Sequence, residues 1–218
     1  MELLLDDRVV AHRGYDVDDT GREFLAMETP IQNGKKHGRE YTWEKSGDLI
    51  LIEPYFNGLN HGTAYQYFQG KLIGSYSFNM GTGWDLWWSA CHGDGRTSSL
   101  SEARHLVDGE RHGFEWWLNS DERSVSEESH FRAGKEHGIT RRWSESTLDP
   151  DYPKYFLNGE EVNAEPYEAA CQNDPTLPKY RSSDNSSTRR EFPTLVIEAI
   201  QRHSGKRAPP AEILSPHA

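Results

Sequence analysis

A short pattern of glycine and histidine recurs along the chain and constrains its fold more than any other feature. Asn or Asp is followed by Gly, by two variable residues and then by His-Gly, as in Asn33–Gly38 and Asn57–Gly62. A degenerate copy covers 79–83 and a truncated one covers 158–162. The second glycines stand at 38, 62, 83, 113 and 138, so successive copies are 24, 21, 30 and 25 residues apart. A step this short holds one supersecondary unit, which predicts a repeat array within a single chain of 218 residues.

Each copy reads as the turn of a β-hairpin. Glycine adopts positive φ at no steric cost, and Asn or Asp tolerates it better than most residues. We therefore predict an all-β fold in which five to six successive hairpins form an elongated sheet, with short helices at the C-terminal end. The predicted structural turn glycines are Gly34, Gly38, Gly58, Gly62, Gly109, Gly113, Gly134 and Gly138.

Large apolar side chains follow each second glycine at alternate positions. The first, third and fifth residues after it share one face of a strand, and the third and fifth are mostly aromatic. This pattern predicts a buried stripe across successive hairpins. Arg141 interrupts the stripe and indicates that the face opens near the last repeat. The predicted core residues are Trp43, Tyr67, Trp84, Trp88, Trp116, Leu118 and Trp143.

Two further tryptophans occupy the fourth position after the second glycine and so face the other way. Trp87 and Trp117 are each adjacent in sequence to a stripe tryptophan or leucine. If that face is open, they form an aromatic patch of the kind that marks binding surfaces. The alternative is that the C-terminal helices or the N-terminal segment cover them.

The recurring pattern resembles the MORN repeat, and more closely its bacterial variant. The best copies run from Tyr55 to Tyr67 and from His130 to Trp143, and the match spans about residues 24–162. The resemblance implies successive β-hairpins and no catalytic residues. Related bacterial proteins are often labelled as predicted antitoxins, and other MORN proteins are described as lipid binders or scaffolds.

The flanks differ in composition from the array. Residues 1–23 form an acidic N-terminal segment, expected to be a loop with one edge strand near 9–11. Residues 163–171 and 193–203 read as helices, with Asn163 at an N-cap and Pro193 at a helix start. A Pro- and Ser-rich linker separates them, and residues 204–218 are expected to be disordered.

Composition excludes several classes of function. The chain holds 35 acidic and 24 basic residues, a net charge of −11, which argues against a nucleic-acid-binding surface. No apolar stretch is long enough for a membrane-spanning helix, and the N-terminus lacks a basic region, so we expect a cytoplasmic protein. Two cysteines cannot build a disulfide framework.

Two groups of residues could support catalysis or metal binding, but a structural role explains each of them better. Cys91 and His92 are adjacent, but neighbours on a strand point to opposite faces and so make no nucleophile–base pair. The recurrent histidines could form a metal-binding column, but each stands in a turn beside glycine, which turn structure alone explains. We expect no catalytic residue, no metal and no cofactor. The histidines are His37, His61, His112 and His137.

These observations favour a non-enzymatic protein-interaction module or scaffold. A basic protein partner would suit the negative charge, and an antitoxin or immunity role follows from the resemblance alone. One alternative is binding to a membrane surface through Arg141, Arg142 and the basic tail, although its surplus of two positive charges is too small for stable anchoring. A second alternative is an enzyme that uses Cys91. The partner and the oligomeric state are not specified by the sequence.

Overall fold

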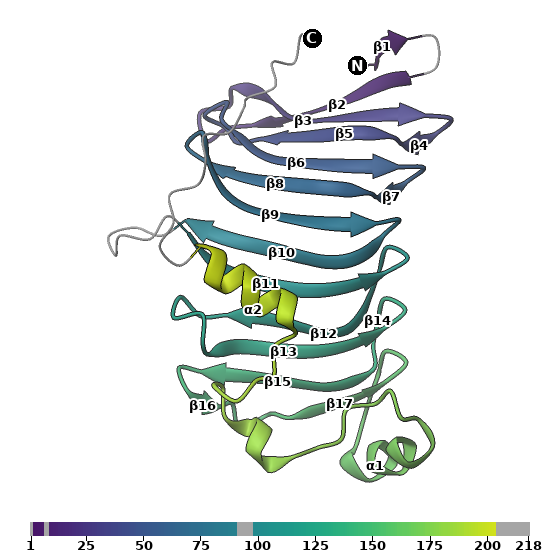
Figure 1. Cartoon of the computed structure of the whole chain (residues 1–218), viewed down its shortest axis with the longest axis vertical. Coiled ribbons are helices and arrows are strands. Elements are labelled where there is room, and N and C mark those ends of the chain that lie inside the picture. Colours follow the sequence, from purple (N-terminus) through teal and green to yellow (C-terminus); the bar gives the residue numbers. More distant parts are fainter. Residues whose placement is uncertain (1, 7–8, 91–97, 204–218) are drawn as a thin grey trace. The chain divides into compact units, whose positions relative to one another are not determined.

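The computed structural model describes residues 2–6, 9–90 and 98–203. Most of them lie in antiparallel β-strands joined as successive hairpins, with two short α-helices near the C-terminal end (Figure 1). The predicted all-β hairpin array is therefore confirmed. The chain divides into two compact units. The first unit contains the described residues 2–6, 9–81, 90, 98 and 203, and the second contains 82–89 and 99–202.

The first unit is a sheet in which each strand pairs with the next. The principal order is β1–β2–β3–β5–β6–β8–β9. The two-residue strands β4 and β7 pair with β3 and β6, and one residue separates each of them from the longer strand that follows, β5 or β8. The strands are β1 (Glu2–Asp6), β2 (Val9–Val17), β3 (Glu23–Gln32), β4 (Lys35–Lys36), β5 (Gly38–Trp43), β6 (Leu49–Phe56), β7 (Leu59–Asn60), β8 (Gly62–Phe68) and β9 (Lys71–Asn79).

The N-terminal segment belongs to this sheet, contrary to the loop expected for residues 1–23. Strand β2 pairs with β1 on one side and with β3 on the other. The register places Val10 opposite Ile31 and Tyr15 opposite Leu25. Apolar cross-strand pairs of this kind stabilise a hairpin without any repeat motif, which explains why the motif did not reveal these strands.

The second unit has the same architecture and adds the helices. Its antiparallel order is β10–β11–β12–β13–β15–β17–β18, with β14 and β16 as two-residue extensions. The elements are β10 (Thr82–Ala90), β11 (Ser98–Val107), β12 (Glu110–Leu118), β13 (Val125–Arg132), β14 (Lys135–Glu136), β15 (Gly138–Ser144), β16 (Thr147–Leu148), β17 (Lys154–Leu157), β18 (Glu160–Val162), α1 (Ala164–Asn173), the 3-10 turn η1 (Ser182–Asn185) and α2 (Thr194–His203).

The repeat motif contains a two-residue turn followed by a separate backbone feature. Asn33 and Gly34 both have positive φ, at 52° and 74°, as a type I′ hairpin turn requires. The second glycine, Gly38, lies four residues later at the start of β5, with φ of 111°. A Cβ atom there would lie 3.1 Å from Cγ of Pro30 on the neighbouring strand, so the position also needs a residue without a side chain.

The degenerate copy has a shorter form of the same motif. Met80 and Gly81 take the positive-φ turn positions, so the turn falls one residue later than an alignment on Asn79 suggests. Gly83 stands two positions after Gly81, whereas in the complete copies the second glycine stands four positions after the first.

Bulges disturb the predicted apolar stripe in the first unit. The register shifts between Thr42 and Trp43 and between Gln66 and Tyr67, immediately before the fifth position of each repeat. Trp43 and Tyr67 are half-buried rather than core residues. The same register shift precedes Leu118 in the second unit, where that residue is buried, so the shift alone does not decide burial at this position. In these two repeats of the first unit the buried side chains stand two or four residues after the second glycine: Glu40 follows Gly38, and Ala64 and Gln66 follow Gly62.

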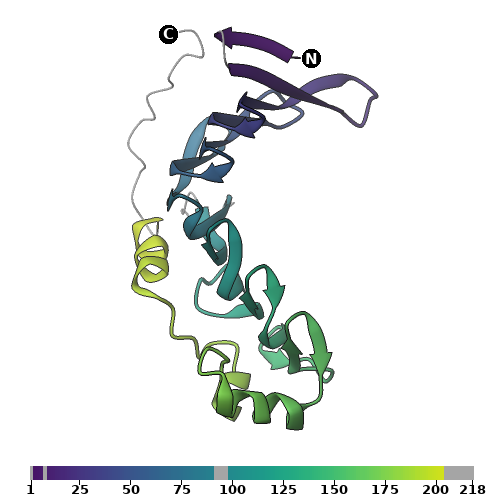
Figure 2. The same ribbon diagram turned by 90° about the vertical axis from the view of Figure 1, so that its right-hand side faces the viewer.

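In the second unit most of the predicted stripe is buried, at Trp88, Trp116, Leu118 and Trp143. The segment between α1 and α2, called the covering segment below, contacts Trp116 and Trp143. Trp84 is half-buried and stacks on Trp116, with ring centroids 5.9 Å apart. The ring of Phe192 packs edge-on against Trp116 at 5.1 Å. Figure 2 shows this segment and α2 on one side of the strands of this unit.

Arg141 does not mark an opening of that face, contrary to its interpretation from the sequence. It is 2% exposed, and its Nη1 lies 2.7 Å from Oε1 of Glu128. Arg190 from the covering segment approaches the other carboxylate oxygen at 2.8 Å, and the indole nitrogen of Trp116 donates to that oxygen. Arg141 and Arg190 share the carboxylate of Glu128, although Arg190 stands 49 positions later in the sequence. This shared contact holds the covering segment over Arg141, which is why Arg141 is buried.

Both predicted helices are present and contribute to the packing of the second unit. Tyr167 of α1 is fully buried against Ile139 and Leu177, and its hydroxyl donates to the carbonyl of Pro178 at 2.7 Å. Asn163 stands at the N-cap of α1, although its side chain makes no capping hydrogen bond. Val196 and Ala199 are the buried residues of α2.

Candidate functional site

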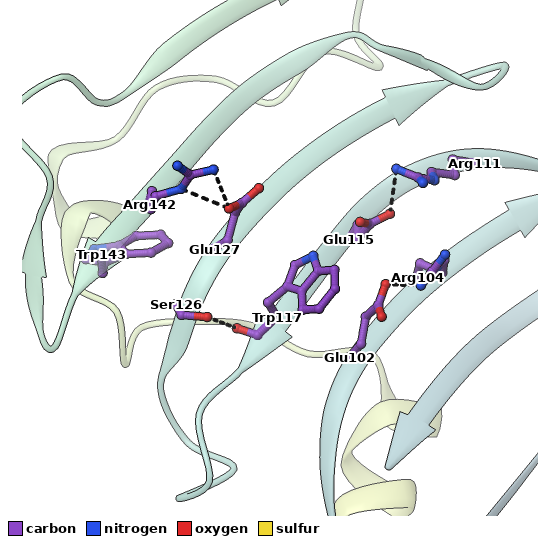
Figure 3. A pocket seen from close by; sticks show the side chains of 9 residues that line it. All are labelled: Glu102, Arg104, Arg111, Glu115, Trp117, Ser126, Glu127, Arg142 and Trp143. Atoms are coloured by element: carbon purple, nitrogen blue, oxygen red, sulfur yellow. Dashed lines mark hydrogen bonds and ion pairs between the residues drawn. The ribbon is translucent and has the colours of Figure 1, made fainter. Parts of the chain in front are cut away.

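The face of the second unit that lies opposite the covering segment carries a cleft of about 560 Å³. Trp117 lies near its centre, and charged side chains from β11, β12, β13 and β15 surround the indole ring (Figure 3). The lining residues are Glu102, Arg104, Arg111, Glu115, Trp117, Ser126, Glu127, Arg142 and Trp143.

Strand register places the main groups of this cleft side by side. Trp117 pairs directly with Glu102 on β11 and with Glu127 on β13, and Glu127 pairs in turn with Arg142 on β15. Residues directly opposite each other on antiparallel strands project from the same face. The sheet therefore sets one indole between two carboxylates. Trp117 is 46% exposed.

Ion pairs connect most of the charges around the indole. Arg142 contacts Glu127 through Nε at 3.0 Å and through Nη2 at 2.9 Å. Arg111 lies 3.4 Å from Glu115. Arg104 pairs with Glu102 and also lies 3.4 Å from Asp85 on β10. Asp85 thus adds a fourth carboxylate near the three arginines.

The floor of the cleft holds carboxylates that are nearly buried. Glu102 is 5% exposed and Glu115 is 6% exposed. Burial raises the pKa of Glu102, and the nearby charges of Glu115 and Asp85 act in the same direction, while Arg104 opposes them. The neutral form of the Glu102 carboxyl is therefore favoured more than in water, and Arg104 is the group that opposes this.

The two tryptophans predicted to bind a partner occupy different environments. Trp117 is exposed in the cleft, and the covering segment packs on the opposite face, so it does not cover Trp117. Trp87 is half-buried and does not line the cleft. Its carbonyl accepts a hydrogen bond from the Ser101 hydroxyl at 3.1 Å. The structure thus presents one of the two tryptophans to solvent and does not bring the pair together.

Two of the four recurrent histidines, His61 and His137, accept hydrogen bonds from backbone groups of the next repeat. Nδ1 of His61 accepts from the backbone N–H of Met80 at 3.2 Å, and Nδ1 of His137 accepts from Asn158 at 3.0 Å. These contacts support the structural explanation of the two histidines. Among residues 2–6, 9–90 and 98–203, no cluster of three or more His, Cys, Asp or Glu side chains is arranged to hold a metal ion.

The remaining candidates are distributed as follows. Cys91 and His92, which suggested an enzyme, lie outside the described residues. Arg141 and Arg142, which suggested a basic membrane-binding patch, are both paired with glutamates. No helix in the described part of the chain is long and apolar enough to cross a membrane.

The sequence pointed to the two tryptophans and to acidic side chains near them, but it did not identify which charged residues line the cleft. A signal for these residues exists, because Glu102 and Arg104 are two residues apart, as are Glu115 and Trp117. Such spacing puts each pair on one face of a strand. No family model matches this chain, and no curated protein matches it either. The interpretation of the cleft therefore rests on its own geometry.

Proposed function

We propose that this chain is a non-enzymatic repeat protein that binds another protein through the open face around Trp117. The observation that carries the proposal is a large indole left 46% exposed inside a cleft of charged side chains. Tryptophan is the residue type most enriched among the side chains that dominate binding energy at protein interfaces. The surrounding ion pairs would form the polar rim of such an interface.

The charge of the cleft favours a partner that presents a basic segment. Three glutamates, Glu102, Glu115 and Glu127, line the cleft against three arginines, and Asp85 adds a fourth carboxylate beside Arg104. A lysine or arginine of the partner beside an apolar side chain on Trp117 would pair with these carboxylates. The net charge of −11 would also attract a basic protein at long range. An antitoxin or immunity role is one form of this proposal and rests on the MORN resemblance alone.

Affinity capture with the tagged full chain, followed by binding measurements on the purified partner, tests the proposal. Trp117→Ala should weaken binding by at least about tenfold, because truncation of a central aromatic anchor costs about 2 kcal/mol or more. Glu127→Gln should slow association and reduce its dependence on salt. Leu195→Ala is the matched control, because Leu195 is 49% exposed on α2, away from the cleft.

The proposal would be wrong if a stoichiometric partner binds the Trp117→Ala variant and the unmodified chain equally well. It would also be wrong if the partner binds through an acidic surface. Sedimentation with anionic liposomes separates the membrane alternative, for which the protein should pellet with the lipid and the Trp117→Ala variant should behave like the unmodified chain.

A further inference from the structure

A second cleft in the second unit lies on the covered face of its sheet. It encloses about 580 Å³ between the strands that carry Trp116, Glu128 and Arg141 and the covering segment from Pro178 to Glu191. This volume lies within the range typical of sites for small molecules. Phe114 and Trp116 provide an aromatic wall, with ring centroids 5.4 Å apart.

Positive charge gathers around this cleft, although the chain as a whole is acidic. Five basic side chains line it, against three carboxylates. The basic residues are Arg141, Lys179, Arg181, Arg189 and Arg190, and the acidic ones are Glu128, Asp184 and Glu191. The cleft therefore has a surplus of two positive charges in a chain whose net charge is −11.

Arg141 lines this cleft and has a buried hydrogen-bonding edge without a partner among the described residues. Its Nη1 contacts Glu128, whereas its buried Nε and Nη2 have no hydrogen-bond partner among the described residues. These two nitrogens lie on the same edge of the planar guanidinium. Two parallel N–H groups on one edge match the two oxygens of a carboxylate or phosphate group.

The buried charges at the site are not balanced, because one carboxylate serves two arginines. Glu128 is the carboxylate for both Arg141 and Arg190, whose side chains are 3% and 4% exposed. Backbone carbonyls of Asp184 and Ser186 hold the remaining nitrogens of Arg190. Burial lowers the pKa of Arg190 and the charge of Arg141 acts in the same direction, while Glu128 opposes them. A buried positive charge without full compensation is costly, and a bound anion would remove that cost.

We propose that this cleft binds a small organic anion whose phosphate or carboxylate group pairs with the free edge of Arg141. Lys179, Arg181 and Arg189 are exposed at its rim and would attract the anion. Trp116 of this site and Trp117 of the protein-binding face are neighbours on β12 and project to opposite sides of the sheet, and Trp143 borders both clefts because it lines the first and packs under Arg190 of the second. The ligand would bridge the sheet and the covering segment.

Isothermal titration calorimetry on the full chain tests this proposal with three probes. Inorganic phosphate presents the phosphate group alone, citrate presents carboxylates, and adenosine monophosphate adds an aromatic ring to the phosphate. Sodium chloride at matched ionic strength is the control for general screening. We expect saturable binding of at least one oxyanion with one site per chain. Protection of the 178–191 segment from proteolysis by that probe should accompany binding.

Two sets of variants locate the binding site. Arg141→Lys keeps the positive charge beside Glu128 but removes the paired N–H edge, and it should weaken binding by at least about tenfold. Arg181→Gln/Arg189→Gln removes two rim charges without touching the buried ion pairs, and it should also weaken binding. Arg123→Gln/Lys135→Gln makes the same change of charge at exposed positions of the same unit and should leave affinity unchanged.

The proposal is overturned if no probe binds at about 10 mM, which is beyond the range of weak specific binding. It is also overturned if binding responds equally to the rim pair and to its control pair. If Arg141→Lys fails to fold by circular dichroism, the rim pair decides the result. Neither outcome depends on whether a protein partner binds at Trp117.

Discussion

Replacing Glu128 with Gln should destabilise the second unit strongly. The carboxylate is 4% exposed and compensates two nearly buried guanidinium groups at 2.7 and 2.8 Å. Glutamine keeps the size of the side chain and can still accept from the indole of Trp116, so the variant isolates the loss of charge. Arg141 and Arg190 would then face each other without compensation. Breaking a buried ion pair by removing one partner costs about 3–5 kcal/mol, and we expect the free energy of unfolding to fall by that amount.

Glu127→Gln is the matched control, because the neighbouring glutamate makes an ion pair of similar length in a different environment. Its pair with Arg142 measures 2.9 Å, but the two side chains are 31% and 52% exposed. Exposed pairs contribute about 0–1 kcal/mol. Urea unfolding followed by tryptophan fluorescence gives both values. A loss below about 1 kcal/mol for Glu128→Gln, or equal losses for the two variants, would refute the reasoning. Adding Arg190→Met to Glu128→Gln should restore part of the stability.

Three further predictions concern stability. Trp143→Ala should cost about 3–5 kcal/mol in urea unfolding, because the residue is buried, and Trp43→Ala should cost less than half as much, since Trp43 is half-buried; equal costs would contradict this. Burial lowers the pKa of His130 below its ordinary value of 6.5, so the unfolded chain binds the proton more tightly and stability should fall as the pH drops below about 6.5. His130→Gln should flatten that pH dependence, and an unchanged slope would argue against the assignment. Gly138→Ala should destabilise the protein more than Gly113→Ala, because a Cβ at 138 would lie 2.6 Å from Cβ of His130, whereas a Cβ at 113 would have no heavy atom of another residue within 4 Å. Thermal unfolding of the two variants compares these costs, and equal losses would contradict the argument.

Local features of the fold were predictable from the sequence because local chemistry determines them. An Asn-Gly or Asp-Gly pair favours a type I′ turn wherever it stands between strands, so the repeat turns could be located without any tertiary information. Helix α1 was recognisable from Asn163 and α2 from Pro193, at their starts. These signals each span a few residues and do not depend on contacts elsewhere in the chain.

Features that depend on distant contacts were missed. Arg141 was read as a sign of an open face, since its carboxylate and the second arginine of the cluster stand 13 residues before it and 49 residues after it. The side chains of Trp43 and Tyr67 were assigned to the core, but the alternating pattern does not show which repeats are covered by a distant segment. The covering segment contacts Trp116 and Trp143. Of the candidate binding site, the sequence yielded Trp117, whereas the acidic floor beneath it required knowledge of strand register.

The contacts made by the repeat histidines give the array a direction. Within each unit, a turn donates backbone N–H groups to the preceding repeat: Asn158 to His137 and Gly159 to the carbonyl of Glu136, and likewise Met80 to His61 and Gly81 to Asn60. A cut that removes the later repeat leaves an imidazole and a carbonyl without donors, whereas a cut that removes the earlier repeat leaves two N–H groups without acceptors. Water can satisfy either set at an exposed end. The two ends of such an array therefore differ in chemistry, since one presents acceptors to solvent and the other presents donors.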